Sequence, residues 1–173
     1  MIKFQTTLRI LLVLFLAPDT GFSKEPFELR LWQGVAPGSE GVADQEKVVE
    51  RGDGKDLIDR SISDTVIPTI TVHLPAKTDK PTAAVIIVPG GGLTRAVIDK
   101  EGNDLARVLA HAGVAGIVLK FRNARTTTTF NGIEVMEADI RRAIRLTRFT
   151  PTNGILHRTE LARSVSQQEV LWR

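Results

Sequence analysis

Three consecutive glycines, Gly90 to Gly92, follow Pro89 directly after an apolar run that ends at Val88. Glycine has no Cβ, so its backbone can adopt positive φ and bring N–H groups close to a ligand oxygen. Two kinds of ligand use such donors, a phosphate group and the oxyanion of an acyl-transfer intermediate. A turn that only reverses the chain is the third interpretation of the same residues.

A nucleotide site would need residues that this loop lacks. The usual patterns are G-x-G-x-x-G and G-x-x-x-x-G-K-[ST], and Arg95 stands where the first pattern requires its last glycine. The next apolar run ends in Lys120, with no acidic residue placed to hold a ribose. The loop therefore favours the oxyanion interpretation over dinucleotide binding.

Ester hydrolysis also needs a nucleophile and a base. On folds with such a loop the nucleophile is the serine of G-x-S-x-G, followed along the chain by an acid and a histidine. No G-x-S-x-G occurs in the 173 residues. The nearest pattern, Pro37 to Gly41 around Ser39, lacks the first glycine and precedes the glycine loop. We therefore assign no catalytic residue.

The three histidines have structural interpretations or lack partners. His73 lies in an apolar strand pattern and is expected to be a packing or surface residue. His111 ends a predicted helix, where a side chain that can become cationic suits the helix dipole. His157 precedes Ser164 and Ser166 in a polar stretch, where nothing holds a nucleophile in place.

The acidic residues near the predicted helices are expected to be structural. Asp99, Glu101 and Asp104 lie near a helix start, where negative charge is favourable, and no histidine cluster joins them to make a metal site. Asp139 lies beside Arg142 on a second predicted helix. We expect no metal and no cofactor.

Apolar patterns predict the elements that position the loop. The alternating run 27–32 predicts a half-buried strand, and the β-branched run 66–74 predicts a strand for which Pro68 suits an edge or a strand start. Residues 38–64 show no apolar periodicity and predict a long exposed loop. The continuous apolar runs 83–88 and 114–121 predict strands buried on both faces of a parallel sheet.

Two helices are expected around these strands. One covers 100–112, and its predicted apolar face consists of Leu105, Val108, Leu109 and Ala112. The other covers 134–149, and its predicted apolar face consists of Met136, Ile140, Ala143, Ile144 and Thr147. The arginines of the second helix are expected on a solvated surface; they are Arg141, Arg142, Arg145 and Arg148.

Residues 1–23 have the pattern of a secretory signal peptide. Lys3 and Arg9 precede the apolar run 10–17, and small residues follow at a spacing that suits cleavage after Ser23. This run is much shorter than the roughly 20 residues that span a bilayer. A membrane anchor and a buried core helix are the alternatives. We expect a secreted or periplasmic protein.

Composition limits the remaining classes. With 173 residues, 42% hydrophobic and 25% charged, the chain predicts a single globular domain. It has no Cys, which excludes disulfides, a thiolate nucleophile and Cys-ligated zinc. The net charge of +3, or +2 after removal of Lys3, Arg9 and Asp19, comes from basic residues interleaved with acids, so no nucleic-acid partner is expected.

Three segments resemble, in their order, the secreted bacterial esterases of the α/β-hydrolase superfamily that are described as acetyl xylan esterase-like or xylanase-associated. They are PTITVHLPAK (68–77), AAVIIVPGGGLTRAVIDKEGNDLARVLAHAGVAGIVLKFR (83–122) and ADIRRAIRLTR (138–148). The matching motifs are D-x-E-G at 99–102 and D-x-x-R-A-I-R at 139–145. Leu93 replaces an aromatic residue of the family and Phe121 a tyrosine. The resemblance covers roughly residues 28–150.

The resemblance implies the amino-terminal part of an α/β-hydrolase fold, with two buried parallel strands, antiparallel strands before them, and flanking helices. It implies that the backbone at Gly91 and Gly92 contributes to an oxyanion hole while Gly90 shapes the turn. Such a donor, when it lies beside a nucleophile, lowers the activation free energy of the reaction by about 2.7–4 kcal/mol. It also implies deacetylation of small esters or acetylated carbohydrate by Ser-His-Asp acyl transfer, without a cofactor.

In that family the serine elbow would follow about ten residues after the segment near Asn153, in a third buried strand. Here a polar stretch with weak helical periodicity follows instead. We therefore expect a signal peptide (1–23), the amino-terminal part of an α/β-hydrolase domain (24–153) and an anomalous tail (154–173).

The favoured hypothesis is a truncated, inactive member of the family. The alternatives are a non-catalytic ligand- or carbohydrate-binding module and a non-functional product. A half-sheet would also leave an apolar edge open to self-association.

Overall fold

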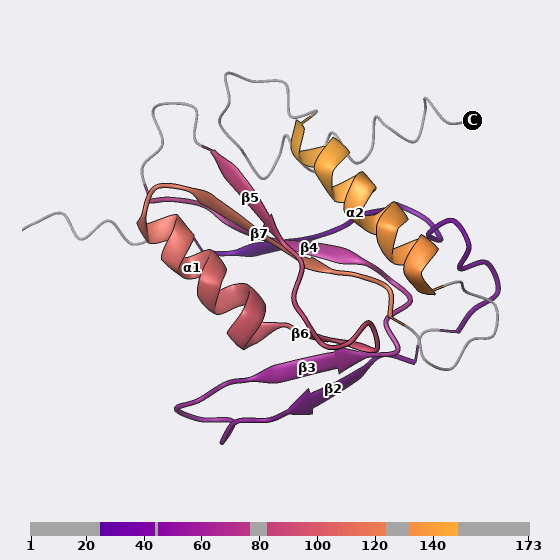
Figure 1. Ribbon diagram of the computed structural model, residues 1–173, viewed down its shortest axis with the longest axis horizontal. Coiled ribbons are helices and arrows are strands. Elements are labelled where there is room, and N and C mark those ends of the chain that lie inside the picture. The colour runs from indigo at the N-terminus through magenta and orange to yellow at the C-terminus, as the bar shows by residue number, and fades with distance from the viewer. Residues whose placement is uncertain (1–24, 44, 77–82, 124–131, 149–173) are drawn as a thin grey trace, which may run out of the picture.

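The computed structural model describes residues 25–43, 45–76, 83–123 and 132–148. In these ranges the protein is a mixed α/β structure with two sheets and two α-helices (Figure 1). The larger sheet has the strand order β1-β4-β7-β5 and the smaller one the order β2-β3-β6. The strands are β1 (Phe27–Arg30), β2 (Lys47–Glu50), β3 (Arg60–Ser63), β4 (Thr69–His73), β5 (Ala84–Ile87), β6 (Arg95–Val97) and β7 (Ala115–Lys120). The helices are the π-helical turn η1 (Asp99–Asn103), α1 (Asp104–His111) and α2 (Gly132–Arg148).

One strand pair of the described structure is parallel. β5 and β7 run in the same direction, with Ile86 opposite Ile117, and the chain between them includes β6, η1 and α1. β4 is antiparallel to both of its neighbours, β1 and β7. The predicted parallel pair, the antiparallel strands before it and the flanking helices are therefore confirmed.

The two helices cover opposite faces of the larger sheet (Figure 1). Side chains alternate along a strand, so neighbouring residues of β7 point to different faces. Leu119 packs in one core cluster with Ala143 and Leu146 of α2. Val118 packs in a second cluster with Ala106 of α1. β7 is thus the centre of both cores.

α1 approaches β7 closely at Gly116. A Cβ added there would lie 2.6 Å from the Cα of Ala106, so the small residues on both elements let the two backbones meet. Ala106 and Ala110 are the buried residues of this helix, whereas Leu105 and Val108 are 47% and 65% exposed. The predicted apolar face is therefore wrong for Leu105 and Val108, because close approach selects small residues, whereas Leu109 of that face does pack against the core.

Two strands of the smaller sheet, β2 and β3, lie in the region 38–64, for which a long exposed loop was predicted. β2 pairs antiparallel with β3, with Val48 opposite Ile62, and β3 pairs with β6. Every residue of β2 is exposed, and Ile62 is the hydrophobic residue that β3 buries. A sheet that buries so few apolar side chains leaves little periodicity in the sequence.

β5 is less buried than predicted. It lies at the end of the sheet order, and Val85 and Val88 are 41% and 40% exposed. β7 is buried along Ala115–Leu119, as expected. β4 lies inside the sheet, so Pro68 marks a strand start and not an edge; the Pro68 carbonyl accepts a hydrogen bond from Leu31 N–H at 3.0 Å.

The signal-peptide and tail predictions, for residues 1–23 and 154–173, lie outside the described residues. Of the helices that are described, none has the length and apolar character needed to cross a membrane.

A buried ion pair attaches α2 to the end of β7. Arg122 Nη2 lies 2.8 Å from Oδ1 of Asp139, and both side chains are 0% exposed. Asp139 also accepts hydrogen bonds from the Nε and the backbone N–H of Arg122. Arg122 Nη1 donates to the Pro37 carbonyl at 2.7 Å and to Ser39 Oγ at 2.9 Å. Burial raises the pKa of Asp139, and the hydrogen bonds from Arg122 oppose that rise.

Arg142 is buried as well. Its Nε donates to the Leu31 carbonyl at 2.9 Å, and its guanidinium carbon lies 4.8 Å from the ring centroid of Trp32. The prediction that the arginines of this helix are solvated is wrong for Arg142, and this residue is not the partner of Asp139. A planar guanidinium can stack on an aromatic ring while it donates from its edge, which explains its place in the core.

We predict that Asp139→Asn lowers the free energy of unfolding by about 3–5 kcal/mol, because it leaves a guanidinium buried without its carboxylate. Urea denaturation of the two proteins measures this difference. Glu137→Gln is the matched control, since Glu137 makes an exposed pair with Arg141 one turn away on the same helix. It should cost less than about 0.5 kcal/mol. Equal losses of unfolding free energy in the two variants would contradict the conclusion that the buried pair of Arg122 and Asp139 stabilises the fold.

Candidate functional site

The glycine loop lies between β5 and β6, at the end of the strand that pairs parallel with β7. Its ends are held together by backbone contacts. Val97 N–H donates to the Gly90 carbonyl at 2.9 Å, and the Gly91 carbonyl accepts hydrogen bonds from the backbone N–H and the hydroxyl of Thr94. The loop is therefore a closed turn with a defined shape.

Glycine is required at position 91 for two reasons. Its φ of +143° is a conformation that residues with a Cβ rarely adopt. A Cβ at this position would also lie 2.2 Å from the carbonyl oxygen of Arg95, well inside contact distance. Gly92 has φ +66°, with open space where a Cβ would lie. Leu93 has φ +61°, which is uncommon for a residue with a side chain, and is 52% exposed.

The backbone donors of the loop divide into two sets. Gly90 N–H donates to Glu101 Oε2 at 3.0 Å and is not available to a ligand. In the part of the chain that the structure describes, the N–H groups of Gly91 and Gly92 have no hydrogen-bond partner. Two adjacent free donors are what binding of a small anion or an oxyanion requires. The oxyanion role expected at this loop stays a prediction.

Glu101 belongs to η1, which is anchored through Asp99. Arg60 of β3 donates to this carboxylate from Nε at 2.7 Å, from Nη2 at 2.8 Å and from its backbone N–H at 2.9 Å. Asn103 Nδ2 donates to Asp99 Oδ1 at 3.0 Å. Burial alone would raise the pKa of Asp99, but the hydrogen bonds from Arg60 and Asn103 outweigh it and lower the pKa to about 2.

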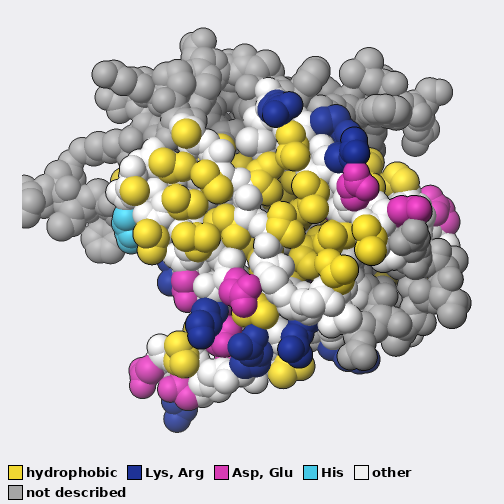
Figure 2. All heavy atoms as spheres, viewed as in Figure 1, with side chains coloured by type: hydrophobic (Ala, Val, Ile, Leu, Met, Phe, Trp, Pro, Cys, Tyr) yellow, Lys and Arg dark blue, Asp and Glu magenta, His cyan; other side chains and the backbone are white. Residues whose placement is uncertain are grey.

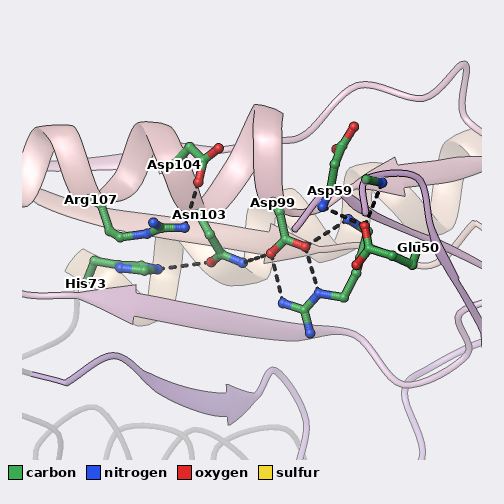
Figure 3. Close-up of polar contacts among 9 residues, drawn as sticks. Glu50, Asp59, His73, Asp99, Asn103, Asp104 and Arg107 are labelled. Carbon is green, nitrogen blue, oxygen red and sulfur yellow. Dashed lines mark hydrogen bonds and ion pairs between the residues drawn. The ribbon is translucent and has the colours of Figure 1, made fainter. Parts of the chain in front are cut away.

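His73 continues this network (Figure 3). Figure 3 shows the Asn103 side chain between His73 and Asp99, and His73 Nε2 lies 3.0 Å from Asn103 Oδ1. Because the amide nitrogen of Asn103 donates to Asp99, its oxygen accepts from His73, which places a proton on Nε2. Burial lowers the pKa of His73. The histidine is a packed residue of β4, as predicted, and its polar partner is an amide.

The other predicted residues lie apart from the loop or pair locally. His111 is an exposed residue at the last position of α1. Asp104 pairs with Arg107 one turn further along that helix (Figure 3). Ser39 is buried, and its Oγ accepts a hydrogen bond from Arg122. It therefore has a structural role, and among the described residues no histidine is hydrogen-bonded to it.

The remaining predicted residues lie outside the described ranges: His157, Ser164 and Ser166. Within those ranges, no group of three or more histidine, aspartate or glutamate side chains could hold a metal ion.

A groove of about 580 Å³ begins beside the glycine loop, at Thr94 and Arg95, and extends over the outer face of the smaller sheet. Lys47, Arg51 and Ser63 contribute to its lining. Basic side chains gather over this sheet, with acidic ones between them (Figure 2). Most of its lining residues are polar or charged, and it gives a bound group room beside Thr94 and Arg95.

Arg60 and Asn103 were missed by the sequence analysis, although they hold the turn that carries Glu101. Arg60 lies in a stretch that predicted a loop, and its partner is 39 positions away in the sequence. A contact between residues so far apart leaves no short-range pattern in the sequence from which it could be predicted. The hairpin before Arg60 is held by Glu50, whose Oε1 accepts from Asp59 N–H at 2.8 Å (Figure 3). That bond and the one from Gly52 N–H lower the pKa of Glu50.

We predict that Asp99→Asn lowers the free energy of unfolding at pH 7 by about 1–2 kcal/mol, less than the full pKa shift would give, because Arg60 is half-exposed and screened. The folded pKa lies below the ordinary 3.8, so this stabilisation is present above that value and is lost as the pH falls toward 2. Urea denaturation of both proteins from pH 7 to pH 2 tests this. The difference in the free energy of unfolding between the original chain and Asp99→Asn should shrink only below about pH 4. Asp104→Asn, in an exposed pair, should show no comparable gap at any pH.

Searches of the chain against protein-family models, curated proteins and solved structures found no match. The family resemblance thus rests on the motifs of the sequence, and the chemistry on the geometry of the loop.

Proposed function

We propose that this chain carries the oxyanion loop of a carboxylic ester hydrolase related to the secreted α/β-hydrolase esterases, and that it does not complete the reaction. The observation that carries the proposal is the pair of free N–H groups at Gly91 and Gly92. They lie in the loop after β5, the strand that pairs parallel with β7, and α/β-hydrolases take one of their oxyanion donors from a loop that follows such a strand.

The chemistry of such a loop is electrostatic. When a nucleophile attacks an ester carbonyl, negative charge develops on the carbonyl oxygen, and donors about 2.7–3.1 Å from that oxygen stabilise it. Donors that are already oriented need no rearrangement during the reaction. Here the contacts of Gly90 with Glu101 and of Gly91 with Thr94 hold the two free N–H groups in place.

The proposal that catalysis is incomplete rests on the residues that should accompany the loop. The 173 residues contain no G-x-S-x-G. Among the described residues, no serine is hydrogen-bonded to a histidine, because Ser39 is engaged by Arg122 and His73 by Asn103. Without an activated nucleophile the loop would bind an acetyl group or a carboxylate without turning it over.

The first experiment assays the purified full chain on an aryl acetate. We predict no turnover above the rate of the buffer, and no change when a serine-directed phosphonate is added. Turnover that the phosphonate abolishes would show that the chain has a working nucleophile, which would overturn the proposal.

The second experiment measures binding at the loop, with acetate as the probe. In protein labelled with ¹⁵N, we expect saturable shifts of the Gly91 and Gly92 amide signals, because acetate presents the oxygen geometry of the reaction product. Gly91→Ala should weaken binding at least tenfold, since its Cβ would meet the Arg95 carbonyl. Gly34→Ala, at a glycine with open space around it, is the matched control and should bind as the original chain does. Equal binding of acetate by both variants would show that the glycine loop is not part of the binding site.

A non-catalytic binding module is the second candidate, and the groove beside the loop favours it. Lys47, Arg51 and Arg95 contribute positive charge to the groove, although Lys47 and Arg51 are already paired with Asp64 and Asp59. Such a surface suits an acidic saccharide or another organic anion better than a neutral one. Tighter binding of a carboxylated sugar than of acetate would distinguish this candidate from the esterase relative.

We also propose that the chain is exported through residues 1–23. The support is the sequence pattern of basic residues, an eight-residue apolar run and small residues at the cleavage position. Expression of the full chain in a bacterium, followed by mass spectrometry of the periplasmic fraction, should recover a protein that begins at Lys24. Recovery of the uncleaved chain from the membrane fraction would favour an anchor.

A further inference from the structure

The outer strands of the two sheets differ in how they are protected from pairing with another chain. Proteins usually place charged residues on such strands, because an exposed edge otherwise recruits further strands. β1 carries Glu28 and Arg30, β2 carries Lys47 and Glu50, and β6 carries Arg95. β5 has the sequence AVII and carries no charge.

The backbone groups on the free edge of β5 follow from its pairing with β7. Ala115 N–H donates to the Ala83 carbonyl at 2.9 Å, and the register places Ala84 opposite Ala115. In a parallel pair alternate residues point their N–H and C=O groups to the same neighbour, so residues 83, 85 and 87 face β7. Ala84, Ile86 and Val88 therefore present their N–H and C=O groups to the other side, where no described strand lies.

The surface around this edge is apolar. Figure 2 shows many hydrophobic side chains over α1 and β5 and toward α2, with polar and backbone atoms between them and charged side chains over α2 itself. Val85 and Val88 of the edge and Leu105 of α1 are among the exposed large hydrophobic residues. An exposed edge that is both uncharged and apolar is a site for strand addition.

We propose that two copies of this chain associate through β5, antiparallel about a two-fold axis that passes beside Ile86. The free backbone groups require an extended strand as the partner, and β5 of a second copy is complementary to them in this register. Ile86 pairs with the second copy's Ile86, and Ala84 pairs with the second copy's Val88, all through hydrogen-bonded positions. A two-fold axis at Val85 would place Val88 opposite residue 82, which lies outside the described residues.

Side chains agree with this register. A two-fold axis perpendicular to the sheet places the same face of both copies on the same side of the joined sheet. Residues that lie opposite each other across the contact must therefore belong to the same face. With Ile86 at the axis, Val85 lies opposite the second copy's Ile87, in a position where the side chains approach closely. The association covers Val85, which is exposed in the single chain, and joins the two larger sheets into one. The contact uses the same patch on both copies and therefore closes at two.

The test compares molar masses of the full chain by light scattering over a range of concentrations. We expect twice the mass of the single chain, and a single-chain mass for Val85→Lys, because a lysine there must be buried against Ile87 of the other copy. Val49→Lys is the matched control: Val49 is an exposed valine in a strand at the edge of the other sheet, and its replacement should leave the doubled mass unchanged. Circular dichroism should show that both variants fold.

Hydrogen exchange separates the remaining outcomes. Protection of the amides of Ala84, Ile86 and Val88 should rise with protein concentration and disappear in Val85→Lys. A single-chain mass at every concentration overturns the proposal, and protection of the same amides in that monomer would mean that another part of the chain covers the edge. Masses that grow beyond two copies would also overturn it, because they require a contact that does not close.

Discussion

The buried pair of Arg122 and Asp139 is the contact on which the arrangement of the larger sheet and α2 depends. It joins Arg122, two residues beyond the end of the central strand β7, to the middle of α2, and it extends to the chain before β2 through Pro37 and Ser39. Two fully buried charges are tolerated only when each has its hydrogen bonds satisfied. A shift of α2 along the sheet would therefore separate charges in an apolar core, so the pair determines the position of the helix more strictly than apolar packing could.

A second polar contact relates the two sheets to each other. Asp99 lies at the start of η1, Arg60 lies in the smaller sheet, and Asn103 connects both to His73 of the larger sheet. The smaller sheet buries few apolar side chains, so directional bonds supply much of what positions it. The glycine loop leads into β6 of this sheet and is bonded to η1, and its shape thus depends on contacts that lie outside the loop itself.

The elements with strong apolar patterns could be predicted from the sequence, and those held by polar contacts could not. The run 114–121 became a buried strand because its side chains pack on both faces, and the glycines after β5 became a tight loop. β2 escaped prediction because all of its side chains are exposed, and β3 because Ile62 is the one apolar residue in it, so neither strand shows an apolar pattern. The face of α1 was misjudged because the close approach at Gly116 favours alanine. Arg142 was misjudged because stacking on Trp32 can bury a charge.

The bond from Gly90 N–H to Glu101 has a consequence for motion. It spans 11 positions of the chain and is the side-chain contact that ties the glycine loop to η1. Protein segments that share such contacts tend to open together as one cooperative unit, with a free energy smaller than that of global unfolding. Loss of order in this single π-helical turn would therefore remove one of the contacts that hold the loop, even while both sheets remain intact. The orientation of the Gly91 and Gly92 N–H groups thus depends in part on the stability of η1.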